Sequence, residues 1–199
     1  MYPLFETIRI ENGIPERLSY HNQRLNRSRK ELFSCDESID LQPLISVPKE
    51  YRQGLVKCKV TYGKSVSEVT FTHYAPRKIR TLQLMDGGEL DYTHKFVDRT
   101  ALDKLKAHAS ADEIIILKNG FITDTSFSNL IFFDGKEWVT PSTPLLKGTM
   151  RQFLLEQNLI REKPIKVTDL NRFSCLKLIN SMLPFSQTED IPISSVFNL

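Results

Sequence analysis

Turn dipeptides placed between apolar runs constrain the fold of this chain most strongly. Asn12-Gly13 follows a strand-like run, and Asn119-Gly120 and Asp134-Gly135 flank the segment from Phe121 to Phe133. Both residues of such a dipeptide tolerate positive φ, which two-residue hairpin loops require. The pattern predicts antiparallel strands joined by tight turns.

The first part of the chain reads as strands around one helix. A strand is expected from Leu4 to Ile10, with Glu6 on the same face as the isoleucines, and a second strand from Leu55 to Tyr62 is expected to pair with Glu68 to Tyr74. A helix is expected from about Leu18 to Phe33, because leucines recur there every seven residues and would share one buried face.

A polar, proline-interrupted stretch divides the chain. Ala75-Pro76-Arg77-Lys78 has the composition of a linker. It is expected to separate a small N-terminal α/β lobe, residues 1–76, from a larger C-terminal lobe, residues 77–199. The second lobe should contain helices from Ala101 to Ala109 and from Thr149 to about Gln157. The fold class is therefore α+β, with two lobes.

Composition excludes several classes of protein. The 199 residues carry a net charge of +3, which is too small to indicate a nucleic-acid partner. No run approaches the roughly 20 apolar residues of a membrane span, and the N-terminus lacks the basic and apolar regions of a signal peptide. Cys35, Cys58 and Cys175 are far apart and form no Cys-x-x-Cys pair. A cytoplasmic protein without a metal site or a membrane partner is expected.

Three features in order fit the needs of pyridoxal phosphate. Lys95 lies between Tyr92 and Phe96, where desolvation would ease loss of its proton, so that it could form an imine and carry a proton. Asp124 stands in an uncharged Ser/Thr segment and could pair with the ring nitrogen. Gly148-Thr149 opens a helix, whose N–H groups attract phosphate.

Each feature also has an ordinary interpretation. A lone lysine is usually a solvated side chain, an aspartate in such a segment can cap its own turn, and nearly every helix has such a start. Arg24 is a further phosphate candidate, whereas Arg27, Arg29 and Lys30 are interpreted as a solvated basic face. Ser181 could add a hydroxyl to the phosphate site, or could simply follow the end of a strand.

Six short motifs, taken together, resemble the class IV aminotransferase family, the pyridoxal-phosphate enzymes of fold type IV. The resemblance covers nearly the whole chain, and the wording is closest to that of the 4-amino-4-deoxychorismate lyases. The motifs, in order, are Phe5-Glu6-Thr7-Ile8-Arg9, His21-Asn22-Gln23-Arg24-Leu25, Lys95 with Arg99, Thr123 to Asn129, Thr140-Pro141 with Gly148-Thr149-Met150-Arg151, and Asn180-Ser181-Met182.

The resemblance implies a two-lobed fold of the D-amino-acid aminotransferase kind. The stretch that usually precedes the first motif is absent, so the N-terminal lobe is expected to be shortened. Asp124 stands where the family usually has glutamate. The resemblance further implies a small-molecule substrate, a homodimer and pyridoxal 5'-phosphate as cofactor. Lys95 would be the catalytic residue, assisted by Thr7, and the cofactor contacts would be Arg24, Lys95, Arg99, Asp124, Gly148, Thr149 and Ser181.

Three functions remain open at this point. The first is a lyase of folate synthesis that converts 4-amino-4-deoxychorismate to 4-aminobenzoate and pyruvate. The second is an aminotransferase acting on branched-chain or D-amino acids, with 2-oxoglutarate as second substrate. The third is a non-catalytic remnant of the fold, against which the presence of Lys95 counts. No Gly-x-Ser-x-Gly motif or glycine-rich nucleotide loop points to another chemistry.

Overall fold

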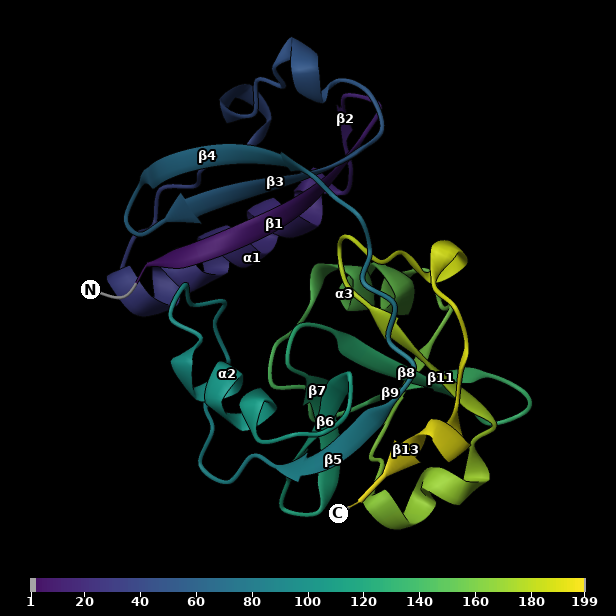
Figure 1. Cartoon of the computed structure of the whole chain (residues 1–199). Helices are drawn as coiled ribbons and strands as arrows, with labels where there is room; N and C mark the ends of the chain where they lie inside the picture. The colour runs from purple at the N-terminus through teal and green to yellow at the C-terminus, as the bar shows by residue number, and fades with distance from the viewer. Residues whose placement is uncertain (1–2, 199) are drawn as a thin grey trace. The chain divides into compact units, whose positions relative to one another are not determined.

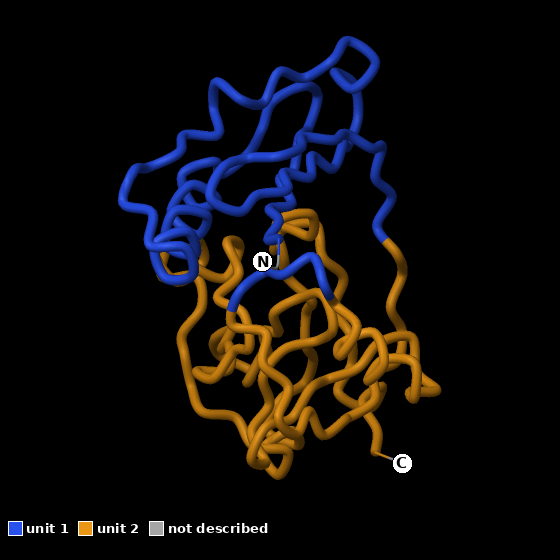
Figure 2. Tube along the Cα trace, turned by 90° about the vertical axis from the view of Figure 1, so that its left-hand side faces the viewer, with its two compact units in different colours: residues 1–76, 94–98 blue, residues 77–93, 99–199 orange. Residues whose placement is uncertain are grey.

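The computed structural model describes residues 3–198 and divides the chain into two compact units. One unit comprises Met1–Pro76 together with His94–Asp98, and the other comprises Arg77–Thr93 together with Arg99–Leu199 (Figure 2). Each unit combines β-sheet with helix, as expected for an α+β protein.

The first unit is a four-stranded antiparallel sheet with one helix packed on it. The strand order is β2-β1-β3-β4. In Figure 1 the sheet lies in front of the helix, so the helix covers only one of its faces. The elements are β1 (Leu4–Glu11), β2 (Ile14–Pro15), α1 (Leu18–Phe33), β3 (Leu55–Tyr62) and β4 (Val66–His73), with the short 3-10 helices η1 (Gln42–Leu44) and η2 (Lys49–Tyr51).

Strict alternation builds the core of this unit. Every second residue of β3 is buried on the helix side of the sheet, where an apolar cluster forms from Leu4, Ile8, Ile10, Leu25, Val56, Cys58, Val60 and Tyr62. The predicted hairpin at Asn12 and Gly13 is confirmed, because both residues have positive φ, at 50° and 82°.

The helix α1 spans the predicted residues, and two of the three leucines predicted for its buried face are confirmed. Leu25 is buried and Leu18 packs against the core, but Leu32 is 40% exposed. The buried positions are His21, Arg24, Leu25, Ser28 and Arg29, which recur with the helical period of 3.6 residues and are mostly polar. Arg29 donates from Nε and Nη2 to the Lys64 carbonyl at 3.0 and 2.8 Å, so it is not part of a solvated basic face.

The segment His94–Asp98 corrects the expected assignment of all residues from 77 onward to the second lobe. It packs with the first unit because its backbone bonds to the start of β1. The Phe5 N–H donates to the Lys95 carbonyl at 3.0 Å, the Val97 N–H donates to the Pro3 carbonyl at 2.8 Å, and Phe96 pairs with Leu4 as an isolated bridge. Lys95 is therefore fixed to an edge of β1.

The second unit contains a nine-stranded mixed sheet and two helices. The strand order is β10-β9-β8-β7-β6-β5-β13, with β11 paired to β8 and β12 paired to β11. The elements are β5 (Leu82–Asp86), α2 (Thr100–Ala107), β6 (Glu113–Lys118), β7 (Phe121–Thr125), β8 (Asn129–Phe133), β9 (Trp138–Pro141), α3 (Thr149–Glu156), β10 (Arg161–Lys163), η3 (Val167–Arg172), β11 (Cys175–Ile179), η4 (Phe185–Gln187), β12 (Ile191–Pro192), η5 (Ile193–Ser195) and β13 (Val196–Phe197).

The segment from Phe121 to Phe133 forms two strands, and Asp124 lies on the first of them, β7. β7 and β8 are antiparallel and meet at the pair Asp124 and Asn129, with a short loop between them. The turn before β7 has positive φ at both Asn119 and Gly120, as predicted. This hairpin is what carries Asp124 into the interior of the unit.

Residues 3–198 contain no helix that is both long and apolar enough to cross a membrane. The same residues contain no group of three or more His, Cys, Asp or Glu side chains placed to hold a metal ion.

Candidate active site

Lys95 lies against an aromatic ring. Its ammonium group is 4.5 Å from the centroid of the Phe5 ring, and its backbone is bonded to that same residue. Phe96, expected from the sequence to flank the lysine, packs instead against the core of the first unit. The half-buried Lys95 is thus held in place by strand pairing and a cation–π contact, unlike an ordinary solvated lysine.

Thr7 follows on the same face of β1 as Phe5. The strand alternates, so Leu4, Glu6 and Ile8 are buried on the helix side, whereas Phe5 and Thr7 are half-buried on the other side. The sequence predicted that Thr7 assists Lys95. In the structure Thr7 lies two residues along β1 from Phe5, whose ring Lys95 contacts.

Arg24 is held by a buried acid on the helix side of β1. Its Nε and Nη2 atoms donate to the two Glu6 carboxylate oxygens, at 2.9 and 2.5 Å. His21 Nδ1 lies 2.6 Å from Glu6 Oε2. Glu6 and His21 are fully buried, and Arg24 is 7% exposed. The two hydrogen bonds to one carboxylate fix the plane of the Arg24 guanidinium.

The charges of this cluster are set by burial and by one another. Burial alone would raise the pKa of Glu6, but the Arg24 charge and the hydrogen bonds from His21 and Arg24 lower it to about 2. Burial lowers the pKa of His21, outweighing the opposite influence of Glu6. The cluster is therefore a carboxylate–guanidinium pair, with a neutral imidazole whose Nδ1–H donates to Glu6.

Asp124 is the buried acid of the second unit. It is 4% exposed. Its Oδ1 accepts from Asn129 Nδ2 at 2.7 Å, and its Oδ2 accepts from the Leu146 N–H at 2.9 Å. Burial raises the pKa of Asp124 to about 6, although these hydrogen bonds and the charge of Arg151 act to lower it. A cationic hydrogen-bond donor beside the carboxylate would stabilise its ionised form and lower its pKa.

Gly148 is small because Asn129 occupies the space next to it. A Cβ atom on Gly148 would lie 2.0 Å from Asn129 Oδ1. The φ of Gly148 is −70°, so its backbone does not demand glycine. Asn129 also donates to the Leu146 carbonyl at 2.8 Å. Asp124, Asn129 and the Leu146 to Gly148 segment thus form one tightly fitted group.

A buried arginine anchors the helix start that follows. Gly148 is the N-cap of α3 and offers no side-chain cap to the first turn, and Thr149 is 4% exposed. Arg151 donates from Nη2 to the Pro141 carbonyl at 2.8 Å and pairs with Glu162. The N–H groups of the first turn of α3 therefore receive no hydrogen bond from a side chain at the N-cap.

The remaining predicted contacts, Arg99 and Ser181, adjoin one loop. Arg99 Nη2 donates to the Ser126 carbonyl at 2.7 Å. Ser181 is 8% exposed and follows Asn180, which donates from Nδ2 to Ser128 Oγ at 2.9 Å. The loop between β7 and β8 therefore links both predicted residues to the hairpin of Asp124.

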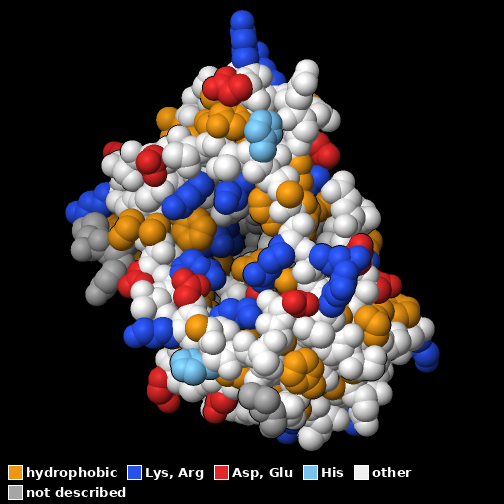
Figure 3. Space-filling model, viewed as in Figure 1, with side chains coloured by type: hydrophobic (Ala, Val, Ile, Leu, Met, Phe, Trp, Pro, Cys, Tyr) orange, Lys and Arg blue, Asp and Glu red, His pale blue; other side chains and the backbone are white. Residues whose placement is uncertain are grey.

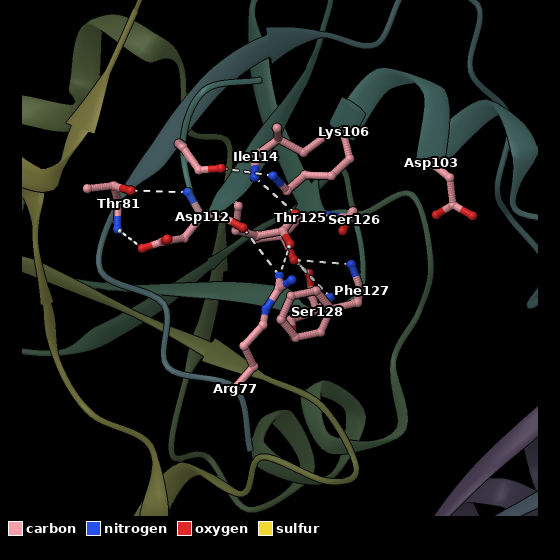
Figure 4. A network of polar contacts seen from close by, with 12 residues as sticks. Arg77, Thr81, Asp103, Lys106, Asp112, Ile114, Thr125, Ser126, Phe127 and Ser128 are labelled. Atoms are coloured by element: carbon pink, nitrogen blue, oxygen red, sulfur yellow. Dashed lines mark hydrogen bonds and ion pairs between the residues drawn. The ribbon is translucent and has the colours of Figure 1, made fainter. Parts of the chain in front are cut away.

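That loop is held by the buried acid Glu113. Figure 4 shows the loop residues Ser126, Phe127 and Ser128 together with Arg77. The Ser126 N–H donates to Glu113 Oε1 at 3.1 Å, and the second Glu113 oxygen pairs with Arg77 at 3.1 Å. The Thr125 hydroxyl donates to the Ser128 carbonyl at 3.1 Å. The loop is thus determined by side-chain bonds within its own unit.

The structure groups the predicted residues in two sets. Lys95, Thr7 and Arg24 belong to the first unit, where Thr7 lies on β1 and the other two contact residues of β1. Asp124, Gly148, Thr149, Arg99 and Ser181 belong to the second unit. Sequence reasoning gave no role to Glu6, His21, Asn129 or Arg151. Glu6 was detectable, because a charged residue stands among the isoleucines on the predicted buried face of its strand.

Comparison with known proteins decides the family. Residues 3–191 match the family model described as Amino-transferase class IV. The chain belongs to the class IV aminotransferase family. It is therefore a member of a family of pyridoxal-phosphate-dependent enzymes, in agreement with the resemblance seen in its motifs.

The similar proteins and structures agree with this family. The chain is 39% identical, over 92% of its length and 98% of the relative, to a protein of Haemophilus influenzae named "Uncharacterized protein". A crystal structure from Haemophilus somnus 129PT, described as a "putative 4-amino-4-deoxychorismate lyase", has a TM-score of 0.84 and 36% identity, covering 92% of this chain and 97% of that one. A fold IV transaminase from Curtobacterium pusillum has a TM-score of 0.76 at 20% identity, covering 96% of this chain and 78% of that one, which shows the fold.

We expect Glu6→Gln to destabilise the protein by about 3 kcal/mol, because it leaves the Arg24 charge buried without its carboxylate. Ionised Glu6 contributes stability fully above pH 4.5, and the contribution is lost as pH falls toward 2. Urea unfolding should therefore separate wild type from variant above pH 4.5 and converge toward pH 2. Asp36→Asn, which removes an exposed partner of Lys30, is the control and should change little at any pH. Equal unfolding curves for wild type and Glu6→Gln would contradict the assignment.

We expect Gly148→Ala to lower stability by about 2 kcal/mol, because the new methyl group overlaps Asn129 and forces it off Asp124. Gly63→Ala is the matched control, since a Cβ there meets no atom within 4 Å. Thermal unfolding of the two variants measures the difference. Indistinguishable melting of the two would show that Asn129 moves freely and that the fitted group is loose.

Proposed function

We propose that this protein is a pyridoxal-phosphate-dependent lyase that converts 4-amino-4-deoxychorismate to 4-aminobenzoate and pyruvate. The position of Lys95 is the main support for the proposal. Its backbone bonds to β1 and its ammonium group lies against the Phe5 ring, which fixes the lysine in the orientation that reaction with a ligand requires. The similarity to the Haemophilus somnus structure named as such a lyase, at 36% identity, favours this reaction over transamination.

The residues present fit the cofactor. Asp124 is a desolvated carboxylate with a pKa of about 6, and a protonated ring nitrogen would supply the cationic donor that its neutral neighbours lack. Within the second unit, the uncapped start of α3 at Gly148 and Thr149 and the Ser181 hydroxyl would bind the phosphate. Arg24 is the candidate phosphate ligand of the first unit. Arg99 would support the site through Ser126.

Each residue then has a defined task. Pyridoxal phosphate, when bound, supplies the electron sink that stabilises charge on the carbon bearing the amine. Lys95 would hold the cofactor covalently until the substrate amine replaces it. The amine of Lys95, once free, would take the proton from that carbon as a base and return it, as an acid, to the departing pyruvate. Thr7 lies on the same face of β1 as Phe5, and its hydroxyl would assist Lys95. Glu6 and His21 keep Arg24 oriented.

The homodimer and the cytoplasmic location expected from the sequence stay predictions. A small-molecule substrate follows from the family, whose members are enzymes of this cofactor.

The cofactor-loaded protein should release 4-aminobenzoate and pyruvate in equal amounts from 4-amino-4-deoxychorismate, with no 2-oxo acid added. Lys95→Ala should lower the rate by about 10³-fold or more, because base and acid are both lost. Lys30→Ala, at an exposed lysine of α1, serves as control and should keep the wild-type rate. Amine transfer that depends on 2-oxoglutarate, without pyruvate release, would instead identify a transaminase.

Cofactor affinity should depend on the ionisation of Asp124. The carboxylate is ionised above a pH of about 6 in the cofactor-free protein, so affinity should fall as pH drops below 6 and the group becomes neutral. Asp124→Asn should bind more weakly at pH 8 and lack this inflection, whereas Asp124→Glu should retain it. Fluorescence titration between pH 5 and 8 measures the profiles, and parallel profiles for wild type and Asp124→Asn would exclude the pairing.

A further inference from the structure

The face of the first unit that carries Lys95 holds a second lysine on the same aromatic ring. Lys59 Nζ lies 5.5 Å from the centroid of the Phe5 ring, and Lys95 Nζ lies 4.5 Å from it. The lysines approach from opposite sides of β1, since Lys59 belongs to β3 and Lys95 to the segment bonded to the start of β1. Phe5 is thus flanked by two cations.

Strand register explains how Lys59 reaches this position. Thr7 on β1 pairs directly with Lys59 on β3, which in turn pairs with Thr70 on β4. Phe5 pairs with Thr61. Alternation places Lys59 on the same face as Phe5 and Thr7, opposite the helix, and the residue is half-buried there. The immediate neighbours of Lys59 on this face are an aromatic ring and hydroxyl groups.

The positive charge of Lys59 is not balanced within the described part of the chain. Among residues 3–198 no carboxylate lies within ion-pair distance of Lys59 or of Lys57, the next lysine on the same face of β3. Arg9, which pairs with Lys57 across the strands, is neutralised by Glu11 and Glu16. Lys and Arg side chains are visible over this sheet face in Figure 3. A cation on an aromatic surface without its own acid suits an anionic, planar ligand.

We propose that Lys59 is a specificity-determining residue that binds a carboxylate of the substrate, with Phe5 as the surface under the substrate ring. The inference rests on the proposed function, in which Lys95 meets the carbon that bears the amine. Lys95 is then committed to proton transfer at that carbon, so Lys59 is the cation left on the ring to bind a carboxylate. The group it recognises is the ring carboxylate on the side away from the amine.

Such a residue would make the enzyme select substrates whose ring carries a carboxylate over amines that lack one. A charge-assisted hydrogen bond to Lys59 favours an aromatic or cyclohexadiene carboxylate over an uncharged ring of the same shape. It contributes to binding in the ground state and in the transition state alike, so its loss should raise KM and leave kcat nearly unchanged. Loss of Lys95, in contrast, would act on kcat.

The test compares 4-hydroxybenzoate with 4-hydroxybenzamide, which has the same ring but no charge. Isothermal titration of the cofactor-loaded wild type should show the benzoate binding roughly 10-fold or more tightly than the amide. Lys59→Gln should lose that preference and leave amide binding unchanged, and Lys59→Arg should restore most of it. Lys57→Gln, on the same strand and face but without a contact to Phe5 in the described structure, is the matched control and should keep the preference.

Each result decides. A benzoate preference that survives Lys59→Gln, or that falls equally in Lys57→Gln, overturns the inference, as does a wild type without any preference. Lys59→Met serves if Lys59→Gln fails to fold, since it keeps an unbranched, flexible side chain of nearly the same length and removes the ammonium group. A Lys59-dependent preference in a protein that makes no 4-aminobenzoate supports the inference and refutes the proposed function. Turnover to 4-aminobenzoate with an unchanged KM in Lys59→Gln does the reverse.

Discussion

The alternation of β1 is the constraint on which the first unit depends. One face of this strand carries Glu6 to the helix, where it fixes Arg24 with two hydrogen bonds. The other face carries Phe5 and Thr7 to the surface on which Lys95 lies. A shift of register by one residue would exchange these faces, burying the ring and exposing the acid. The buried ion pair and the lysine site are therefore set by the same pairing of β1 with β3.

The second unit depends on a buried carboxylate, Asp124. The Asp124 carboxylate is buried, and no Lys or Arg among residues 3–198 forms a salt bridge with it. Burial raises its pKa to about 6, although the charge of Arg151 acts to lower it. Asn129 orients it, and Gly148 leaves room for Asn129. A buried carboxylate with a raised pKa lowers the stability of the protein, and such groups are typical of ligand-binding sites. A purely structural aspartate would be more stable if it were exposed or paired.

The sequence predicted the elements well and the environments less well. Turn dipeptides located the hairpins at Asn12 and Asn119 because positive φ is a local property that asparagine and glycine reveal. The polar residues on the buried face of α1 were missed, because the leucine heptad indicates only the apolar contacts. His21 and Arg24 are buried because they pair with Glu6 of β1. The place of Lys95 beside Phe5 could not be predicted, since it depends on pairing between segments 90 residues apart in the chain. The need for glycine at position 148 could not be predicted either. The backbone there has an ordinary φ, and a larger residue is excluded by the side chain of Asn129.

The central claim is that Lys95, alone among the lysines, holds the cofactor. Borohydride reduction of the cofactor-loaded protein, followed by proteolysis and mass spectrometry, tests it most directly. The account predicts that the reduced pyridoxyl group is found on the peptide containing Lys95 and that Lys95→Ala takes up no label. A label on Lys59 or Lys147, or a protein that binds no cofactor, would contradict it.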